Sequence, residues 1–342
     1  MSEVIGQEWT DREQKMNINR DYFWFQLFKT HGIGPKILAS VAKILEAENL
    51  NPEMLPRSQR DLSAQFPELA KILKDKIHTA DGDEVSEAYE DIKRHGVSII
   101  YPGHPDFPPH LLEIAPILFV KGQLKRLMSD NVSIVGARNV SDKGIRITRN
   151  LARELVGQGI NIVSGYATGV DSEAHLGALE TEGTTTLVLP NGINQLRQKN
   201  AFKKFNWDRD VLVVSQFDPD TKWQAWNAMA RNQLVCALSK AVVVIESGSE
   251  RDTQGKMSGT FNTAKTALDL NLPLFVVNPN FLDNPPTGNA VLIALGGYSL
   301  DPVNGAEVIA KHIFGKIEES ASVGNQNAAE QLPLPFENFE TC

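Results

Sequence analysis

The chain has 342 residues, more than one domain usually contains, and its apolar and charged fractions of 42% and 22% are ordinary for a globular protein. No apolar run approaches the ~20 residues needed to cross a bilayer. The first residues also lack the pattern of a secretory signal, so we expect a cytoplasmic protein. Its two cysteines, Cys236 and Cys342, fit neither a disulfide framework nor a thiolate metal site.

Residues 1–125 predict a smaller, largely helical domain. Residues 21–45 have the pattern of two helices joined by a glycine-rich turn at 32–35, which is typical of helix-hairpin-helix or SAM-like units. Such a turn lets backbone amides approach a DNA phosphate, but it also joins packed helices that bind nothing. Two short apolar runs at 97–100 and 117–120 flank a proline-rich stretch and predict strands, and we expect the domain boundary near 125.

Residues 126–316 predict an α/β domain. Strand-like apolar runs alternate with helical segments, and each run is apolar on both faces, as in a strand that helices cover on both sides. We therefore expect a Rossmann-like, doubly wound and mostly parallel sheet. The predicted strands are 132–135, 160–163, 185–189, 211–214, 241–245 and 274–277.

The net charge of −8 is distributed unevenly along the chain. Residues 317–342 contain five glutamates and no basic residue, and we expect them to form a disordered acidic tail. By contrast, the stretches 138–153 and 197–209 each contain five cations and one aspartate. A basic stretch can be a solvated helix face or a phosphate-binding surface, and its place in the fold decides between the two.

The acidic tail ends with a short apolar peptide, QLPLPF, which is too small to form a core. Gln331, Leu334 and Phe336 fit the pattern of peptides that dock in the hydrophobic groove of the bacterial sliding clamp. The sequence therefore predicts a partner-binding peptide at these positions.

Small residues follow several of the predicted strands where each strand ends. In an open α/β sheet, ligands bind at this edge, where helix N-termini present amides with partial positive charge. Arg138 adds a guanidinium group suited to phosphate. The sequence therefore predicts a phosphate-binding edge. Its residues, with two lysines of the second basic stretch, are Gly136, Arg138, Lys143, Gly144, Ser164, Gly165, Gly169, Lys203, Lys204, Ser258, Gly259 and Thr260.

Common catalytic and cofactor motifs are absent from the sequence. No GxGxxG follows the first strand of this domain, the glycines near 248–257 lack the spacing of a P-loop, and no HExxH, CxxC or GxSxG occurs. His175 lies four residues after Asp171 on one helical face, but a core or surface histidine explains this spacing more simply. We expect no catalytic residue, no metal and no cofactor.

Six segments together resemble the DNA-processing protein A (DprA, also called Smf) family. They are SIVGARNVSDKG, NIVSGYATGVDSEAHLGAL, MARNQLVCALS, MSGTFNTAKTAL, LFVVNP and GNAVLIALGG. The resemblance implies a Rossmann-like core that binds single-stranded DNA in a basic pocket, forms homodimers and helps to load the recombinase RecA, with no reaction. It assigns DNA-binding positions to Arg138, Ser164, Gly165, Ala167, Gly169, Asp171, Arg231, Asn232, Ser258, Gly259 and Thr260.

The chain departs from the family pattern at several places. Thr168 and Gln233 stand where the family often has arginine, which removes two phosphate contacts, and we expect no C-terminal winged helix. The pathway implied is DNA uptake, recombination or defence. A nucleotide sensor of the wider superfamily remains the alternative. The cytokinin-releasing phosphoribohydrolases of that superfamily are disfavoured, because residues 257–263 lack the preceding glycines and the glutamate of their PGGxGTxxE turn.

Overall fold

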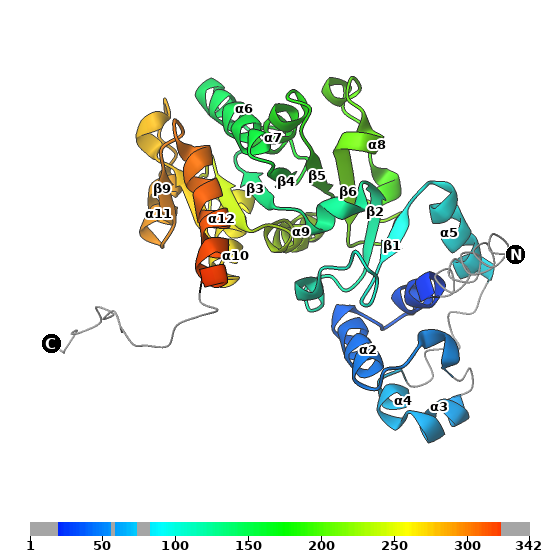
Figure 1. Ribbon diagram of the computed structural model, residues 1–342. Helices are drawn as coiled ribbons and strands as arrows, with labels where there is room; N and C mark the ends of the chain where they lie inside the picture. The colour runs from blue at the N-terminus through cyan, green and yellow to red at the C-terminus, as the bar shows by residue number, and fades with distance from the viewer. Residues whose placement is uncertain (1–19, 56–58, 74–82, 323–342) are drawn as a thin grey trace, which may run out of the picture.

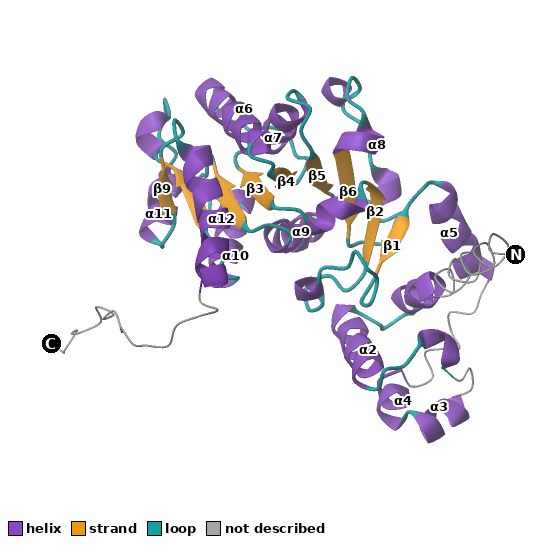
Figure 2. Cartoon of the chain, in the orientation of Figure 1, coloured by secondary structure: helices purple, strands orange, loops and turns teal. Residues whose placement is uncertain are grey.

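The structure is a computed structural model that describes residues 20–55, 59–73 and 83–322. A nine-stranded mixed sheet with helices on both faces forms most of the molecule, and a group of helices from the first hundred residues lies beside one end of the sheet (Figures 1 and 2). The predicted Rossmann-like α/β fold with a smaller helical part is confirmed. Within the described residues, no helix is long and apolar enough to cross a membrane.

The N-terminal part consists of short helices whose apolar side chains join a core that continues into the α/β part. The predicted helix pair is present, since residues 20–29 and α2 are helical and the turn between them contains Gly32 with a φ of 79°. Trp24, Phe25 and Leu38 of these helices are buried in that core. The labelled helices here are α2 (Pro35–Ala47), α3 (Gln59–Gln65), α4 (Pro67–Leu73) and α5 (Asp83–Arg94), with a 3-10 turn η1 (Pro52–Met54).

The sheet has the order β1-β2-β6-β5-β4-β3-β7-β8-β9. Neighbouring strands from β6 to β9 run parallel, whereas β1–β2 and β2–β6 pair antiparallel. The six strands predicted between 132 and 277 are all present. The strands are β1 (Ser98–Ile100), β2 (Leu118–Gly122), β3 (Asn131–Val135), β4 (Asn161–Ser164), β5 (Thr185–Val188), β6 (Val211–Ser215), β7 (Ala241–Val244), β8 (Leu274–Val277) and β9 (Tyr298–Leu300).

The sheet extends across the domain boundary that the sequence predicted. β1 and β2 were expected in the N-terminal domain, but β2 pairs with β6 through residues 119–122. Both strands therefore continue the main sheet, and the helices before them share an apolar core with β2, β5 and β6. The division at 125 stays a prediction. The predicted tail begins at residue 317, but the structure has a helix there that continues to Ser322. The rest of the tail, with Gln331, Leu334 and Phe336, lies outside the described residues.

Two helical layers cover the sheet. Along β3, Val132 and Ile134 pack into the core under α6, α7 and α12, whereas Val135 packs into the core under α9, α10 and α11. This alternation explains why the strands are apolar at almost every position. The helices of the α/β region are α6 (Asp142–Gly157), α7 (Val170–Leu179), α8 (Trp207–Asp210), α9 (Ala225–Ala237), α10 (Gly259–Asp269), α11 (Thr287–Ala294) and α12 (Gly305–Ser322). The 3-10 turns are η3 (Pro109–Leu111), η4 (Leu124–Met128), η5 (Ile193–Gln195), η6 (Asn200–Phe202) and η7 (Pro279–Phe281).

The strand order of the sheet reverses at β3, so β3 and its neighbour β7 form the switch point of the sheet. From β3 the strands β4, β5 and β6 are added on one side, and the chain then returns to place β7 on the other side of β3. Ligands of doubly wound sheets bind at such a switch point. The buried Asn289 of α11 fixes the loop there. Its Oδ1 accepts from the amide of Ser247 at 2.8 Å, and its Nδ2 donates to the carbonyls of Ile245 and Val277 at 2.8 Å each.

Replacing Asn289 by alanine should lower the free energy of unfolding by about 2 to 4 kcal/mol, because it leaves one amide and two carbonyls buried without a partner. Urea denaturation followed by circular dichroism measures the loss. Asn262→Ala is the matched control, because that half-buried side chain has no hydrogen bond among the described residues. Equal losses in the two variants would contradict the assigned role of Asn289.

Candidate functional site

Two adjoining hollows open at the carboxyl end of the sheet. The larger, a cavity of about 620 Å³, lies between the turn after β3 and the helices α9 and α10. The smaller, of about 350 Å³, lies over the turn after β4. Arg138, Ala167, Trp223 and Arg231 line both of them, and we call the two together the groove. The groove thus lies at the switch point of the sheet.

A buried arginine forms the floor of the groove. Arg231 of α9 is 6% exposed, and its Nη1 lies 3.9 Å from Oδ2 of Asp171 and donates to the carbonyl of Val188 at 3.4 Å. Its Nε is buried without a hydrogen-bond partner among the described residues. A Cβ atom at Gly165 would lie only 1.2 Å from Nη1. The turn after β4 therefore needs glycine at this position to admit the guanidinium group.

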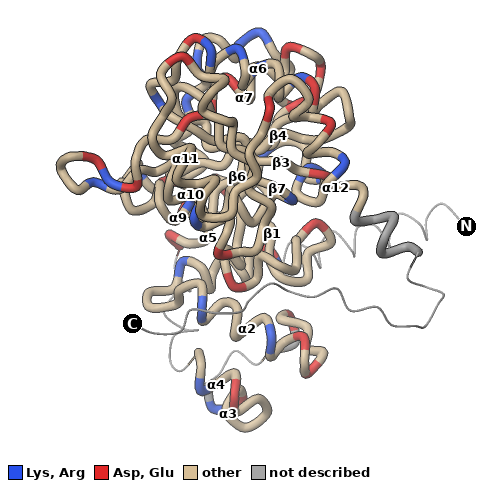
Figure 3. Tube along the Cα trace, turned by 90° about the vertical axis from the view of Figure 1, so that its left-hand side faces the viewer, with Lys and Arg blue, Asp and Glu red and all other residues tan. Residues whose placement is uncertain are grey.

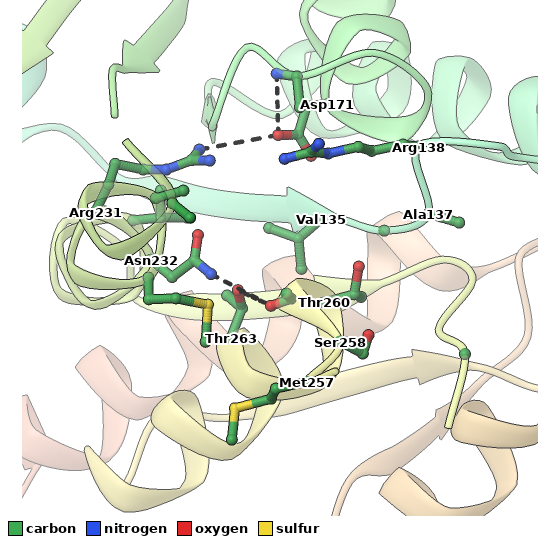
Figure 4. Close-up of a pocket in the computed structure, with 18 of the residues that line it drawn as sticks. Val135, Ala137, Arg138, Asp171, Arg231, Asn232, Met257, Ser258, Thr260 and Thr263 are labelled. Atoms are coloured by element: carbon green, nitrogen blue, oxygen red, sulfur yellow. Dashed lines mark hydrogen bonds and ion pairs between the residues drawn. The ribbon is translucent and has the colours of Figure 1, made fainter. Parts of the chain in front are cut away.

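A second arginine approaches the same carboxylate. Arg138 and Arg231 point toward Asp171 from opposite sides (Figure 4). Burial raises the pKa of Asp171, while the charge of Arg231 opposes this change. Burial lowers the pKa of Arg231, Asp171 opposes this change, and Arg138 adds to it. An arginine keeps its charge in a protein, so two cations face one carboxylate and the floor of the groove attracts anions.

The first turn of α10 forms the opposite wall. Ser258 is its N-cap, with Oγ accepting from the amide of Phe261 at 3.3 Å, and Gly259 and Thr260 follow along the wall. Nδ2 of Asn232 donates to the carbonyl of Gly259 at 3.3 Å and so fixes α10 against α9 (Figure 4). The first amides of a helix lack intrahelical partners and carry partial positive charge. This wall and the two arginines therefore both favour an anionic ligand.

Exposed aromatic side chains at the rim were missed by the sequence analysis. Trp223 and Trp226 line the larger hollow, and their residues are 56% and 70% exposed. A large apolar side chain so exposed beside a cationic floor suits a ligand with flat apolar parts, such as a nucleic-acid base. The available signal was the segment KWQAW at 222–226, where two tryptophans follow a lysine at the start of α9.

The structure brings many of the sequence-predicted site residues together and leaves others outside. The groove is lined by Gly136, Arg138, Gly165, Arg231, Asn232, Ser258, Gly259 and Thr260, and Thr168 lines its smaller hollow. Lys143, Gly144, Ser164, Gly169, Lys203, Lys204 and Gln233 do not line it. The first group comes from the turns at strand ends, from α9 and from the start of α10. The small-residue turns that the sequence indicated therefore lie at the groove.

Residues near the groove that do not line it have structural partners. Lys143 lies 3.5 Å from a carboxylate oxygen of Asp283, and the amide of Gly144 donates to the N-cap hydroxyl of α6 at 3.0 Å. Ser164 is buried and donates to the carbonyl of Ile134 at 2.6 Å. Gly169 has a φ of 75°, and a Cβ there would lie 2.3 Å from a carbonyl oxygen of the turn after β3. These residues shape the turns that carry the groove.

The two lysines of the second basic stretch lie apart from the groove. Lys203 and Lys204 line another hollow with Arg149, and Glu180 contributes a carboxylate there. Arg149 donates to Glu173 at 2.6 Å and to Glu180 at 3.2 Å. Acidic and basic segments accordingly alternate around α6 and α7 (Figure 3). Glu173 of α7 and Glu180 at its C-cap therefore offset part of the positive charge of the two stretches, at Arg149 and Lys204.

Lys199 lines the smaller hollow, His175 is buried behind it, and both have structural partners. The ammonium group of Lys199 donates to the carbonyls of Tyr166 and Ala167 at 2.8 and 3.1 Å, and so holds the turn after β4. His175 is fully buried, and its Nδ1 lies 2.6 Å from Oγ1 of Thr185. Burial lowers the pKa of His175 to about 3, so the imidazole is neutral at physiological pH. Among the described residues, no group of three histidine, cysteine, aspartate or glutamate residues could hold a metal ion.

Comparison with known proteins gives a consistent set of relatives. The model of the DNA recombination-mediator protein A family matches residues 98–311, a span that includes every strand of the sheet. Protein Smf of Synechocystis sp. is 29% identical over 275 residues, which cover 76% of this chain and 65% of the relative. The DNA processing protein DprA of Bacillus subtilis is 27% identical over 264 residues, which cover 72% of this chain and 86% of the relative. The chain thus spans slightly less than two thirds of the first relative and most of the second.

The solved structures that resemble this one include two DNA processing proteins A. DNA processing protein A of Streptococcus pneumoniae superposes with a TM-score of 0.66 at 23% identity, covering 82% of this chain and 94% of that protein, and it has the same fold. DNA processing protein A of Helicobacter pylori, known for its single-stranded DNA binding mode, gives a TM-score of 0.53 at 27% identity, covering 63% of this chain and 96% of that protein.

The buried His175 predicts a pH dependence of stability. The unfolded chain takes up a proton on this residue near pH 6.5, whereas the folded protein does so only near pH 3, so stability is lost as the pH falls between these values. From pH 7 to pH 5 the free energy of unfolding should fall by about 2 kcal/mol through His175 alone. Denaturation of the wild type and His175→Gln at both pH values should show a smaller fall in the variant. His31→Gln, at an exposed position, should keep the wild-type fall.

Proposed function

This chain belongs to the DNA recombination-mediator protein A family, and on that premise we propose that it binds single-stranded DNA in the groove at the carboxyl end of its sheet. The observation that carries the proposal is the combination of two converging arginines with exposed tryptophans on one rim. A single strand offers phosphates to the arginines and unstacked bases to the indole rings, whereas a duplex keeps its bases stacked inside.

Each part of the groove has its own role in the proposed binding. Arg138 has no hydrogen bond or ion pair within the described part of the chain, so its guanidinium is free to bind a phosphate bidentately. The first turn of α10 receives a neighbouring phosphate, and Arg231 supplies charge from below without leaving Asp171. Lys203 and Lys204 belong to the proposal as contacts for a longer strand that extends beyond the groove.

We extend the proposal to a role in DNA recombination that protects single strands and helps to load RecA, with the protein acting as a homodimer. Its pathway would be DNA uptake, recombination or defence. The groove holds no nucleophile paired with a base among its lining residues, and we propose binding without catalysis. The peptide with Gln331, Leu334 and Phe336 remains a proposed contact for the sliding clamp.

A nucleotide sensor is the second candidate, and the observation that favours it is the size of the larger hollow. A cavity of about 620 Å³ is within the range that holds a small ligand. The two functions differ in their dependence on ligand length. An oligothymidylate of about 20 nucleotides should bind better than thymidine monophosphate, because several phosphates then contact the protein at once. Tighter binding of the mononucleotide would instead favour the sensor.

Replacing Arg138 by alanine should weaken binding of the oligothymidylate by about 1 to 3 kcal/mol, the value of a charge-assisted hydrogen bond. The slope of log K against log salt should become shallower by about 0.7, because one fewer counterion is released. Fluorescence anisotropy at several salt concentrations measures both quantities. Arg153→Ala removes an exposed arginine on α6 outside the groove and should change neither. Unchanged binding by a folded Arg138→Ala variant would refute this phosphate site.

Replacing Trp223 or Trp226 by alanine should cost about 1 to 3 kcal/mol of binding per lost stacked base, with an unchanged salt slope, because stacking releases no counterion. Bases stacked on these rings should also quench the intrinsic fluorescence of the wild type. Trp207→Phe provides the control, since that indole donates to the carbonyl of Phe202 and lies outside the groove. If quenching persists in the Trp223→Ala, Trp226→Ala double variant, the strand lies elsewhere.

A further inference from the structure

A glutamate occupies the start of α6 from across the switch point. Glu246 follows β7, and its carbonyl accepts from the amide of Ala137 at 2.8 Å, which continues the pairing of β3 and β7 beyond the strands. Its side chain is buried, with the residue 8% exposed, and it reaches the N-cap of α6. The carboxylate thus lies beneath the turn that leads from β3 into the groove.

The start of α6 is built around this carboxylate. Ser141, the N-cap, donates from its amide to Oε2 of Glu246 at 3.1 Å and from its hydroxyl to Oε1. A Cβ atom at Gly144 would lie 2.3 Å from Oε1, so the glycine leaves the space that the carboxylate fills. The loop that carries Glu246 is held in turn by Asn289, through the residues on either side of it. Backbone, hydroxyl and glycine together therefore form a cradle for an anion.

In other doubly wound folds, the corresponding cradle binds the pyrophosphate of a nucleotide cofactor. There the helix after the first strand of the parallel unit directs its N-terminal amides at the ligand. Here the protein's own carboxylate takes both the space and the negative charge of that ligand. A phosphate brought to this position would meet Glu246 as a like charge in a poorly solvated place, which is unfavourable.

We propose that Glu246 is a specificity-determining residue that excludes the linked phosphates of free nucleotides from the start of α6. This inference rests on the proposed function, because it explains how the groove selects a single strand. A nucleoside diphosphate concentrates its charge on adjacent phosphates and needs a compact cradle. A single strand spaces its phosphates along the chain, and Arg138 with the first turn of α10 receives them in the groove, which Glu246 does not line.

Inorganic pyrophosphate is the probe that tests the exclusion, because it has the linked phosphates without a base. Isothermal titration should show binding at least about tenfold tighter in Glu246→Gln and Glu246→Ala than in the wild type, since both variants remove the competing charge. Glu250→Gln is the matched control. It neutralises an exposed glutamate in the same loop, which lies 2.9 Å from Lys265, and should keep the wild-type affinity. Adding Ser141→Ala to Glu246→Gln should reverse the gain, because it removes a donor of the cradle.

Circular dichroism establishes that each variant is folded. If the alanine variant unfolds, Glu246→Gln alone tests the exclusion of pyrophosphate, because glutamine keeps an oxygen that accepts from the amide of Ser141. Wild-type pyrophosphate affinity in a folded Glu246→Gln variant overturns the exclusion. Oligothymidylate binding, measured on the same samples, should be retained. Failure of the wild type to bind the oligonucleotide would overturn the proposed function, whereas an unchanged pyrophosphate affinity with intact oligonucleotide binding would overturn only the role of Glu246.

Discussion

The groove depends on the burial of one guanidinium group. Taking such a charge out of water is costly, and the cost is offset when a carboxylate and further hydrogen-bond acceptors surround it. Arg231 has Asp171 and the carbonyl of Val188 as partners, and the missing side chain of Gly165 provides the space. Asp171 also accepts from the amide of Ala167 at 3.3 Å. Because Arg231 belongs to α9 and Asp171 to α7, this pair joins the two helical layers at the edge of the sheet where the ligand site lies.

The parallel part of the fold was predictable because its signal is local. A strand covered on both faces is apolar at nearly every position, and each of the six predicted runs is such a strand in the structure. The antiparallel extension was not predictable in the same way. β1 and β2 are as apolar as the rest, but nothing within residues 98–122 indicates that their partner is β6, far along the chain. Pairing of this kind depends on the tertiary structure, which a scan of short windows does not contain.

The same distinction applies to the site. Gly136, Arg138 and Ser258 were found because strand ends and helix starts are local features, and these converge in every doubly wound sheet. The basic stretches were less informative, since the carboxylates that offset them come from other elements, as Glu180 does for Arg149. The exposed tryptophans gave no periodic signal, because a residue outside the core follows neither a helical nor a strand repeat. Glu246 was missed since its partners lie on another strand-end turn.

The pairing of β2 with β6 also has a consequence for how the protein is made. A chain leaves the ribosome from its N-terminus, so β1 and β2 emerge and can pair before β6 has been synthesised. One side of the β2 backbone then stays unpaired until β6 has been synthesised. An unpaired strand is a template for association with other chains. Until β6 has been synthesised, β2 therefore gives the nascent protein an edge through which it can aggregate.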